Sequence, residues 1–297
     1  MTPIVHHPDY DAALPEGHRF PMRKFAALAA LLRDEGFAPN GFVKPAPADR
    51  AALVRAHDAA YVDAVLNQSV DPAFTRRIGL PVTASVAARA CAAVGGTVCA
   101  GRLALRYGVA CNTAGGSHHA GRAGGSGFCV FNDVAVAALA LLAEGLVRRV
   151  LVIDLDVHQG DGTADIFTGD DRVFTLSIHC ADNFPTRKIP GDLDVALPRG
   201  AGGGAYRAAL AEALPAVFAQ AAPDIVFYNA GIDPHVDDAL GLLALTDEDL
   251  AARDACVLAA ARARGVPLAG VIGGGYGPDV DVLARRHAGL FRAAQGR

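Results

Sequence analysis

The sequence predicts an α/β protein whose central parallel sheet is covered by helices on both faces. Short runs rich in β-branched residues alternate along the chain with longer runs rich in alanine and leucine. The strand-like runs are apolar on both faces, which is typical of buried parallel strands separated by crossover helices. In several of these runs polar residues follow the apolar stretch directly, where the carboxyl end of a strand is expected.

The expected elements follow one another in chain order without a long linker. The strands are expected at residues 109–112, 150–156, 173–179, 225–229 and 268–272. The helices are expected at residues 23–33, 84–106, 132–144, 206–219 and 247–264. The last helix follows Thr246, a good N-cap residue, and begins with three acidic residues that suit the positive end of the helix dipole. Since no composition break divides the chain, we expect one domain over residues 1–297.

Composition and charge exclude several classes of protein. With 297 residues, of which 52% are hydrophobic, the chain can form a full core, so a disordered or coiled-coil protein is excluded. A net charge of −4 implies no strongly basic face, and we expect no nucleic-acid partner. The six cysteines form no C-x-x-C pair, which suits a reducing compartment.

Nothing in the hydropathy pattern points to a membrane partner. The longest purely apolar run covers residues 134–143, which is too short for a bilayer that needs ~20 residues. The first ten residues lack the basic start and apolar run of a signal peptide. We therefore expect a soluble cytoplasmic protein with no membrane partner.

The run that begins at residue 149 ends in alternating polar residues. Asp154, Asp156 and His158 follow an apolar run of four residues, and alternate positions of a strand point to one side. Two carboxylates side by side in a buried cleft repel each other, and a metal ion is the usual remedy. The alternative is that the strand ends early and the acids lie in solvent.

Three other strand ends carry polar or glycine-rich sequences as well. His118 and His119 follow the first expected strand, Asp233 follows the fourth, and three glycines and Tyr276 follow the fifth. Parallel strands place their carboxyl ends at one edge of the sheet, where open α/β folds bind ligands. We therefore expect these residues to meet.

The residue types suit metal-assisted hydrolysis. Two carboxylates and one imidazole from Asp156, His158 and Asp233 make an open ligand set that leaves room for water and substrate. Zn²⁺, Fe²⁺ and Mn²⁺ all accept such ligands, so the residues leave the choice of metal open. The adjacent imidazoles of His118 and His119 suit acid–base work, and the Tyr276 hydroxyl could stabilise an oxyanion.

Five motifs together make the chain resemble the zinc-dependent histone deacetylase family. The motifs are Gly-Gly-Ser-His-His at 115–119, Gly-Phe-Cys-Val-Phe-Asn-Asp at 127–133, Asp-Leu-Asp-Val-His-Gln-Gly-Asp-Gly at 154–162, Gly-Ile-Asp-Pro at 231–234 and Gly-Gly-Gly-Tyr at 273–276. The resemblance covers essentially the whole chain. It implies a single-domain, three-layer arginase/deacetylase-type fold, with a central, mostly parallel sheet of about eight strands flanked by helices.

The resemblance implies a metal-dependent deacetylase. Asp156, His158 and Asp233 would hold Zn²⁺, with Fe²⁺ as the other option. His118 would act as general base, and His119 as general acid.

Further residues would assist the reaction. Asp154 would orient His118, Asp161 would orient His119, and Tyr276 would polarise the scissile amide carbonyl. A tunnel for the acyl-lysine substrate would be lined by Phe128, Phe184, Leu240, Gly127 and Gly274. Arg23 would lie on an exit channel for the acid product. A structural K⁺ ion would be held by Asp154, Asp156, His158, Ser177 and Ile178.

Two stretches, at residues 14–25 and 76–81, resemble the bacterial, class IV-like branch of the family. Polyamine-selective relatives carry a gatekeeper glutamate where this chain has Leu240. An apolar residue there favours ε-N-acyl-lysine in a peptide or protein over an acetylpolyamine, which stays the alternative substrate together with other small N-acyl amines. Hydroxamate-type inhibitors are expected to bind.

Three competing functions are weaker. A ureohydrolase needs a two-metal cluster from two strands, and only one strand here ends in Asp-x-Asp-x-His. The Gly-x-Gly-x-x-Ala run at 200–205 resembles a dinucleotide motif, but the acid expected about 20 residues later lies at the wrong end of the next strand. A non-catalytic acyl-lysine binder is disfavoured because every catalytic motif is present.

Overall fold

The computed structural model describes residues 2–297; Met1, the first residue of the predicted domain, lies outside them. Its centre is one sheet of seven strands in the order β1-β2-β7-β6-β3-β4-β5, and every neighbouring pair is parallel. The strands are β1 (Ile4–Val5), β2 (Val109–Asn112), β3 (Val150–Asp154), β4 (Val173–Cys180), β5 (Leu193–Leu197), β6 (Ile225–Asn229) and β7 (Leu268–Val271). The predicted α/β class with a central parallel sheet is confirmed, with seven strands rather than about eight.

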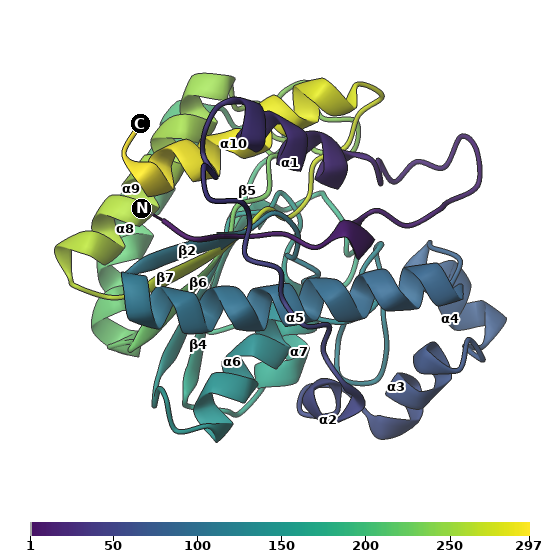
Figure 1. Ribbon diagram of the computed structural model, residues 1–297. Helices are drawn as coiled ribbons and strands as arrows, with labels where there is room; N and C mark the ends of the chain where they lie inside the picture. The colour runs from purple at the N-terminus through teal and green to yellow at the C-terminus, as the bar shows by residue number, and fades with distance from the viewer. Residues whose placement is uncertain (1) are drawn as a thin grey trace.

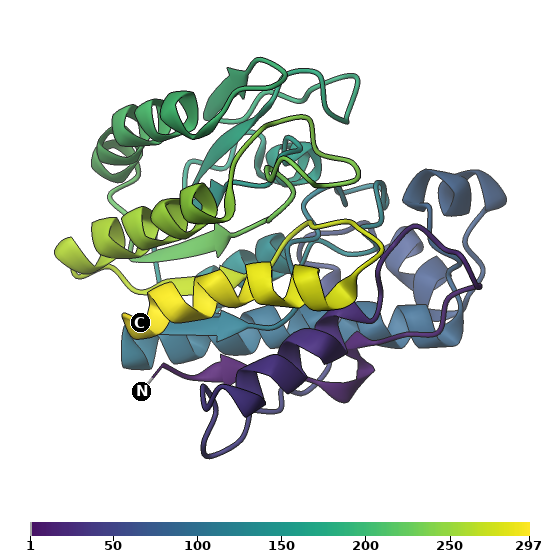
Figure 2. The ribbon, with the colours of Figure 1, turned by 90° about the horizontal axis from the view of Figure 1, so that it is seen from above.

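Helices cover both faces of this sheet (Figures 1 and 2). They are α1 (Lys24–Asp34), α2 (Arg50–Leu53), α3 (Ala59–Leu66), α4 (Pro72–Ile78), α5 (Ala84–Tyr107), α6 (Asp133–Ala143), α7 (Asp161–Phe167), α8 (Gly203–Ala221), α9 (Asp247–Ala263) and α10 (Val280–Gln295), with a 3-10 turn η1 (Pro8–Tyr10). Helices α5, α6 and α7 lie on one face, and α8, α9, α10 and α1 lie on the other.

The bounds of the expected strands need small corrections. Strand β3 ends at Asp154, two residues earlier than predicted, so Asp156 lies in the following loop. Strands β1 and β5 are additional. β1 has only two residues, and β5 is a half-exposed edge strand. Neither strand has the continuous apolar run that marks the buried strands.

Several helices, α9 and α6 among them, begin at N-cap residues whose side chains accept a hydrogen bond from the first turn. At the N-terminus of α9, the Thr246 hydroxyl accepts a hydrogen bond from the Asp249 amide (3.3 Å), and the Asp249 carboxylate accepts one from the Thr246 amide (3.1 Å). This reciprocal pair is a capping box. The Asn132 side chain accepts a hydrogen bond from the Ala135 amide (2.9 Å) and starts α6 in the same manner.

Helix α5 is the longest helix and lies directly against the sheet. By length and composition alone it is the one helix of residues 2–297 that could cross a membrane, but 72% of its most apolar window is buried inside the fold. Gly101 of α5 allows close contact, since a Cβ atom there would lie 3.0 Å from the Phe227 ring of β6. We therefore interpret α5 as a core helix.

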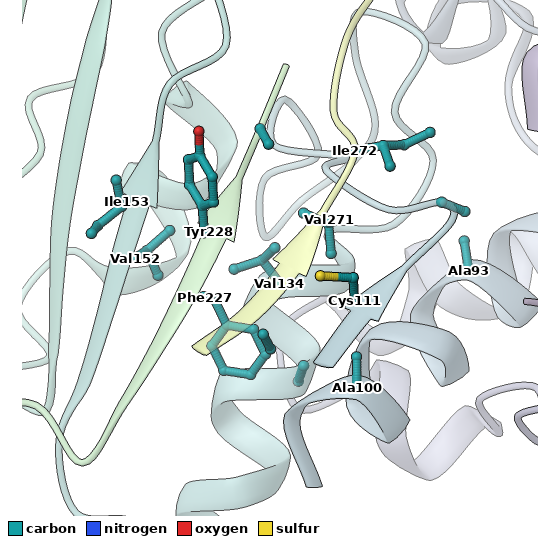
Figure 3. Close-up of a cluster of buried hydrophobic side chains, with 14 of the residues drawn as sticks. Ala93, Ala100, Cys111, Val134, Val152, Ile153, Phe227, Tyr228, Val271 and Ile272 are labelled. Carbon is teal, nitrogen blue, oxygen red and sulfur yellow. The ribbon is translucent and has the colours of Figure 1, made fainter. Parts of the chain in front are cut away.

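The core continues on both sides of β6, as Figure 3 shows for neighbouring residues. Phe227 and Tyr228 point to opposite faces of the sheet, as successive residues of a strand must. The Tyr228 hydroxyl donates a 2.5 Å hydrogen bond to the Asp254 carboxylate of α9. Each helical layer is thus anchored to the central strand.

A buried histidine, His57, makes the stability of the fold sensitive to acid. Its Nδ1 lies 2.8 Å from the Gly121 carbonyl oxygen, and its Nε2 accepts a hydrogen bond from the Asn132 amide (2.9 Å). This pattern requires a neutral ring protonated at Nδ1. Burial lowers the pKa of His57 from 6.5 to about 4, so the unfolded chain takes up a proton at a pH where the folded protein does not.

We expect the free energy of unfolding to fall as the pH is lowered from 6.5 towards 4, with His57 contributing about 3 kcal/mol over that range. Urea denaturation at several pH values measures the slope. The variant His57→Gln, whose amide does not titrate, should show a smaller slope than the native protein, whatever its stability at neutral pH. Equal slopes would contradict the assignment.

Candidate metal centre and catalytic site

Four loops at the carboxyl edge of the sheet bring the predicted site residues into one cluster. The residues are His118 and His119 after β2, Asp156 and His158 after β3, Asp233 after β6 and Tyr276 after β7. All six are at most 9% exposed. Strand β3 does end early, as the alternative interpretation required, but its acids are buried rather than solvated.

The carboxylates of Asp156 and Asp233 converge on one imidazole. His158 Nδ1 lies 2.9 Å from Asp156 Oδ1 and 3.2 Å from Asp233 Oδ2. Potential ligand atoms of the three residues lie within 4.8 Å of one another. The other oxygen of Asp233 accepts a hydrogen bond from the Val157 amide (2.9 Å), which fixes the carboxylate between the two loops.

This trio fits a divalent metal ion. Asp233 Oδ2 is buried and accepts no hydrogen bond within residues 2–297. Burial, together with the charge of Asp156, raises the pKa of Asp233 to about 7. A cation would relieve both the repulsion and the unsatisfied oxygen. The donor set of two carboxylates and one imidazole suits Zn²⁺ or Fe²⁺.

A second trio, His118, His119 and His158, also lies within 4.8 Å. It brings no negative charge of its own, and the Nδ1 atoms of His118 and His119 are already bonded to the carboxylates of Asp154 and Asp161. The trio with two carboxylates is therefore the better match for a dication.

The three glycines before Tyr276 are needed for close approach. The Gly274 amide donates a 2.7 Å hydrogen bond to Asp156 Oδ2. A Cβ atom on Gly274 would lie 2.6 Å from that oxygen and would contact the Asp233 carboxylate as well. Any side chain at this position would displace the carboxylates.

The two adjacent histidines each have a carboxylate partner. His118 Nδ1 lies 2.7 Å from Asp154, and His119 Nδ1 lies 2.5 Å from Asp161. These are the pairs expected from the sequence. Asp154 is held in turn by the Asn229 side chain, which donates a 2.9 Å hydrogen bond to Oδ1.

The surroundings of the two histidines shift their pKa values in opposite directions. Burial lowers the pKa of His118, but the carboxylates of Asp154 and Asp156 outweigh burial and raise the pKa to about 9. Burial, together with the charge of His118, lowers the pKa of His119 to about 4. These shifts favour a neutral imidazole at His119, whereas His118 is the base expected from the sequence.

Tyr276 faces the same space from the opposite loop. Its ring lies edge-on to His158, with 6.2 Å between centroids. Burial raises the pKa of the hydroxyl well above its usual value, and the carboxylate of Asp156 adds to this. The hydroxyl therefore keeps its proton and can act as a donor. The Tyr276 amide donates a 2.7 Å hydrogen bond to Asp238, which the sequence analysis does not single out.

The predicted tunnel residues lie around two connected spaces. Phe128, Phe184, Leu240 and Gly127 line an outer cavity of about 400 Å³ that reaches His119, His158 and Tyr276. An inner cavity of about 30 Å³ is lined by both histidines, by Gly274 and again by Gly127 and Phe128. The Phe184 ring is edge-on to His119 at 4.8 Å, yet 43% exposed.

Arg23 does not reach the inner cavity. It is exposed and lines a separate surface hollow with residues of the 277–280 turn. The arginine at the inner cavity is Arg89 of α5, which is 5% exposed and whose guanidinium carbon lies 4.7 Å from the Phe25 ring centroid. A role for Arg23 in an exit channel stays a prediction without support from this placement.

Of the residues expected to bind K⁺, Asp154 lies on β3, Ser177 and Ile178 lie on the neighbouring strand β4, and the other two, Asp156 and His158, lie in the loop after β3. Asp154 pairs with Ser177 in the sheet register, and Ile178 follows on β4. The Ser177 hydroxyl is 2.9 Å from His179 Nδ1. Asp154 and Ser177 both line a small cavity of about 10 Å³. Occupancy by a monovalent cation stays a prediction.

Two buried cationic side chains, Lys24 and Arg253, hold the loops of the site, and neither is predicted from the sequence. Lys24 Nζ donates 3.2 Å hydrogen bonds to the carbonyl oxygens of Gly273 and Gly275, on either side of the glycine that contacts Asp156. Arg253 of α9 donates to the carbonyl oxygens of Leu155 (3.2 Å) and Gly231 (2.6 Å), each one or two residues from a predicted metal ligand. Neither residue carries a signal in the sequence, because a lone Lys or Arg is exposed in most proteins.

Comparisons with known proteins agree on one family. The profile of the histone deacetylase domain matches residues 18–293. A protein of uncharacterised function from Picosynechococcus is 49% identical over 99% of this chain and 98% of its own length. A probable deacetylase from Methanothermobacter thermautotrophicus is 30% identical over 99% of this chain and 90% of its own. The solved HD domain of HDA15 matches all of this chain and 88% of that chain with a TM-score of 0.83, at 21% identity.

Removal of the Lys24 ammonium should loosen the loop that carries Tyr276. In Lys24→Met the carbonyls of Gly273 and Gly275 lose their donor, so amide exchange in residues 273–276 should speed up by about tenfold or more. Hydrogen-exchange mass spectrometry measures this, with the exposed Lys44→Met as control. Unchanged exchange in this loop would show that Lys24 does not hold it.

Proposed function

The chain belongs to the histone deacetylase family, and on that premise we propose that it hydrolyses N-acyl amides, with ε-N-acetyl-lysine as the substrate group. Membership in the family supports a deacetylase in general. The observation that carries the finer proposal is the buried cluster of Asp156, His158 and Asp233 beside two carboxylate-bound histidines and Tyr276. The outer cavity of about 400 Å³ reaches His119, His158 and Tyr276 of this cluster and offers room for an acyl-lysine side chain.

The metal site would contribute one part of the chemistry. A divalent ion held by Asp156, His158 and Asp233 supplies Lewis-acid activation of water and of the amide carbonyl. The remaining steps fall to side chains of this chain.

His119 is the residue we propose as general base. Its ring is neutral, its Nδ1 is bonded to Asp161, and it lines both the outer and the inner cavity. Its Nε2 can take the proton of the attacking water and then return it to the amine nitrogen as the C–N bond breaks. His118, whose high pKa keeps it charged, would stabilise the negative charge that develops nearby.

Tyr276 is the residue we propose as oxyanion donor. It lies across the space from the histidines, and its raised pKa keeps the proton on the hydroxyl. A hydrogen bond from this hydroxyl would strengthen as the carbonyl oxygen gains charge in the tetrahedral intermediate. The hydrogen bond from the Tyr276 amide to Asp238 holds the main chain at this position.

The inner cavity supports a short acyl group. Its volume of about 30 Å³ accommodates a methyl group or a water molecule but not a long acyl chain. Leu240 at the outer cavity brings no charge to bind an ammonium, which supports acyl-lysine over acetylpolyamines. Zinc as the natural metal, the cytoplasmic location, inhibition by hydroxamates and the class IV-like branch stay proposals.

The proposal predicts turnover of acetyl-lysine peptides by the zinc-loaded protein. Mass spectrometry should detect the free lysine product, octanoyl-lysine should react much more slowly, and a hydroxamate should block the reaction. Tyr276→Phe should lower kcat by about 10²–10³ through loss of the oxyanion donor. The exposed Tyr107→Phe serves as control.

Two results would overturn parts of this proposal. No cleavage of any acyl-lysine, with zinc verified as bound, would remove the proposed substrate. An unchanged rate in Tyr276→Phe would remove that residue from the mechanism while leaving the activity itself in place.

A further inference from the structure

Three arginines stand at the entrance to the outer cavity. Arg19 precedes α1, and Arg76 and Arg77 lie in the last turn of α4; all three are exposed and line the cavity. The one acidic residue in that lining is Asp182. The entrance therefore has an excess of positive charge, although the chain as a whole carries a net charge of −4.

The segments that carry these arginines contact Gly127 and Phe128, which form part of the cavity wall. The Gly127 amide donates to the Arg77 carbonyl oxygen (3.1 Å), and the Phe128 amide donates to the Ile78 carbonyl oxygen (2.6 Å). The Arg19 guanidinium carbon lies 5.9 Å from the centroid of the Phe128 ring. The ring centroids of Phe128 and Tyr276 are 5.9 Å apart. Phe128 therefore lies between the Arg19 guanidinium and the residue proposed as oxyanion donor.

Within residues 2–297 none of the three guanidinium groups forms a salt bridge, although other exposed arginines do, such as Arg50 with Asp63 and Arg102 with Glu144. Asp182, the acid of the entrance, is already 3.5 Å from Arg199. The positive charge is thus left without an internal counter-ion.

A structural role explains only part of this arrangement. Arg76 and Arg77 suit the negative C-terminal end of α4. Arg19 lies in the segment before α1, and its guanidinium is placed over the Phe128 ring at the cavity. There it can pair with a negative group that a substrate brings into the cavity.

We propose that the natural substrate carries a carboxylate close to the acylated amine, and that Arg19, Arg76 and Arg77 select for it. This inference rests on the proposed deacylase function and specifies its substrate class. An acyl-lysine flanked by aspartate or glutamate fits this entrance, as does a small N-acyl amine with a free carboxylate. A polyammonium substrate would be repelled.

The test compares substrates that differ only in charge. One series is an acetyl-lysine tripeptide flanked by aspartate, serine or lysine. The other is Nα,Nε-diacetyl-lysine with a free carboxylate or as its carboxamide, which separates a peptide from a small molecule as the source of the carboxylate. We expect kcat/KM to be about tenfold higher for the acidic tripeptide than for the serine one, and lowest for the lysine one.

The arginines should account for that preference. In the double variant Arg76→Gln/Arg77→Gln, the ratio of kcat/KM for the acidic substrate over the neutral substrate should fall towards one. Adding Arg19→Gln to this variant should lower the ratio further. The exposed Arg148→Gln should keep the native ratio. Added salt should weaken the preference of the native protein, since exposed charges are screened.

The outcomes separate this inference from the function on which it rests. Equal turnover of all the substrates, or a ratio that the variants leave unchanged, would overturn the charge selection but leave the deacylase function intact. No turnover in either series, with zinc bound, would instead count against the deacylase function. A preference in the diacetyl-lysine pair alone would identify a small molecule as the carboxylate source.

Discussion

The burial of three carboxylates at one edge of the sheet is the constraint on which the site depends. Asp154, Asp156 and Asp233 are each at most 3% exposed, and an unpaired buried charge costs several kcal/mol. His118 pairs with the first, His158 lies between the other two, and backbone amides satisfy further oxygens. One oxygen of Asp233 accepts no hydrogen bond within residues 2–297, and a metal ion bound there would balance the charge.

The parallel arrangement of the sheet brings these groups together. Each strand of the buried centre ends at the same edge, so four loops that lie between residues 113 and 276 of the chain meet there. Cationic side chains of two helices hold these loops through hydrogen bonds to backbone carbonyl oxygens. Lys24 of α1 binds the glycine loop before Tyr276, and Arg253 of α9 binds the loops that carry Asp156 and Asp233. The helical layer thus fixes the site and also covers the sheet.

The parts of the fold that sequence reasoning predicts are those with strong local signals. The five buried strands have continuous apolar runs, and the polar residues that follow them mark the edge at which the site lies. Strands β1 and β5 carry no such run. Helix α10 is not among the expected helices, although Leu283, Leu290 and Phe291 have helical spacing. Lys24, Arg89 and Arg253 could not be identified, because burial of a single charged residue depends on partners from distant elements. The assignment of charge between His118 and His119 depends on distances to carboxylates, which a sequence does not contain.

The central claim is that the buried acids and His158 form a site for one divalent ion. Isothermal titration with Zn²⁺ in buffers of different ionisation enthalpy measures both binding and proton release. We expect one ion per chain and release of protons at neutral pH, because Asp233 and His158, with pKa values of about 7 and about 10, must lose protons on binding. The double variant Asp156→Asn/Asp233→Asn should lose this binding. Zinc binding that survives in the double variant, or that releases no protons in the native protein, would contradict the account.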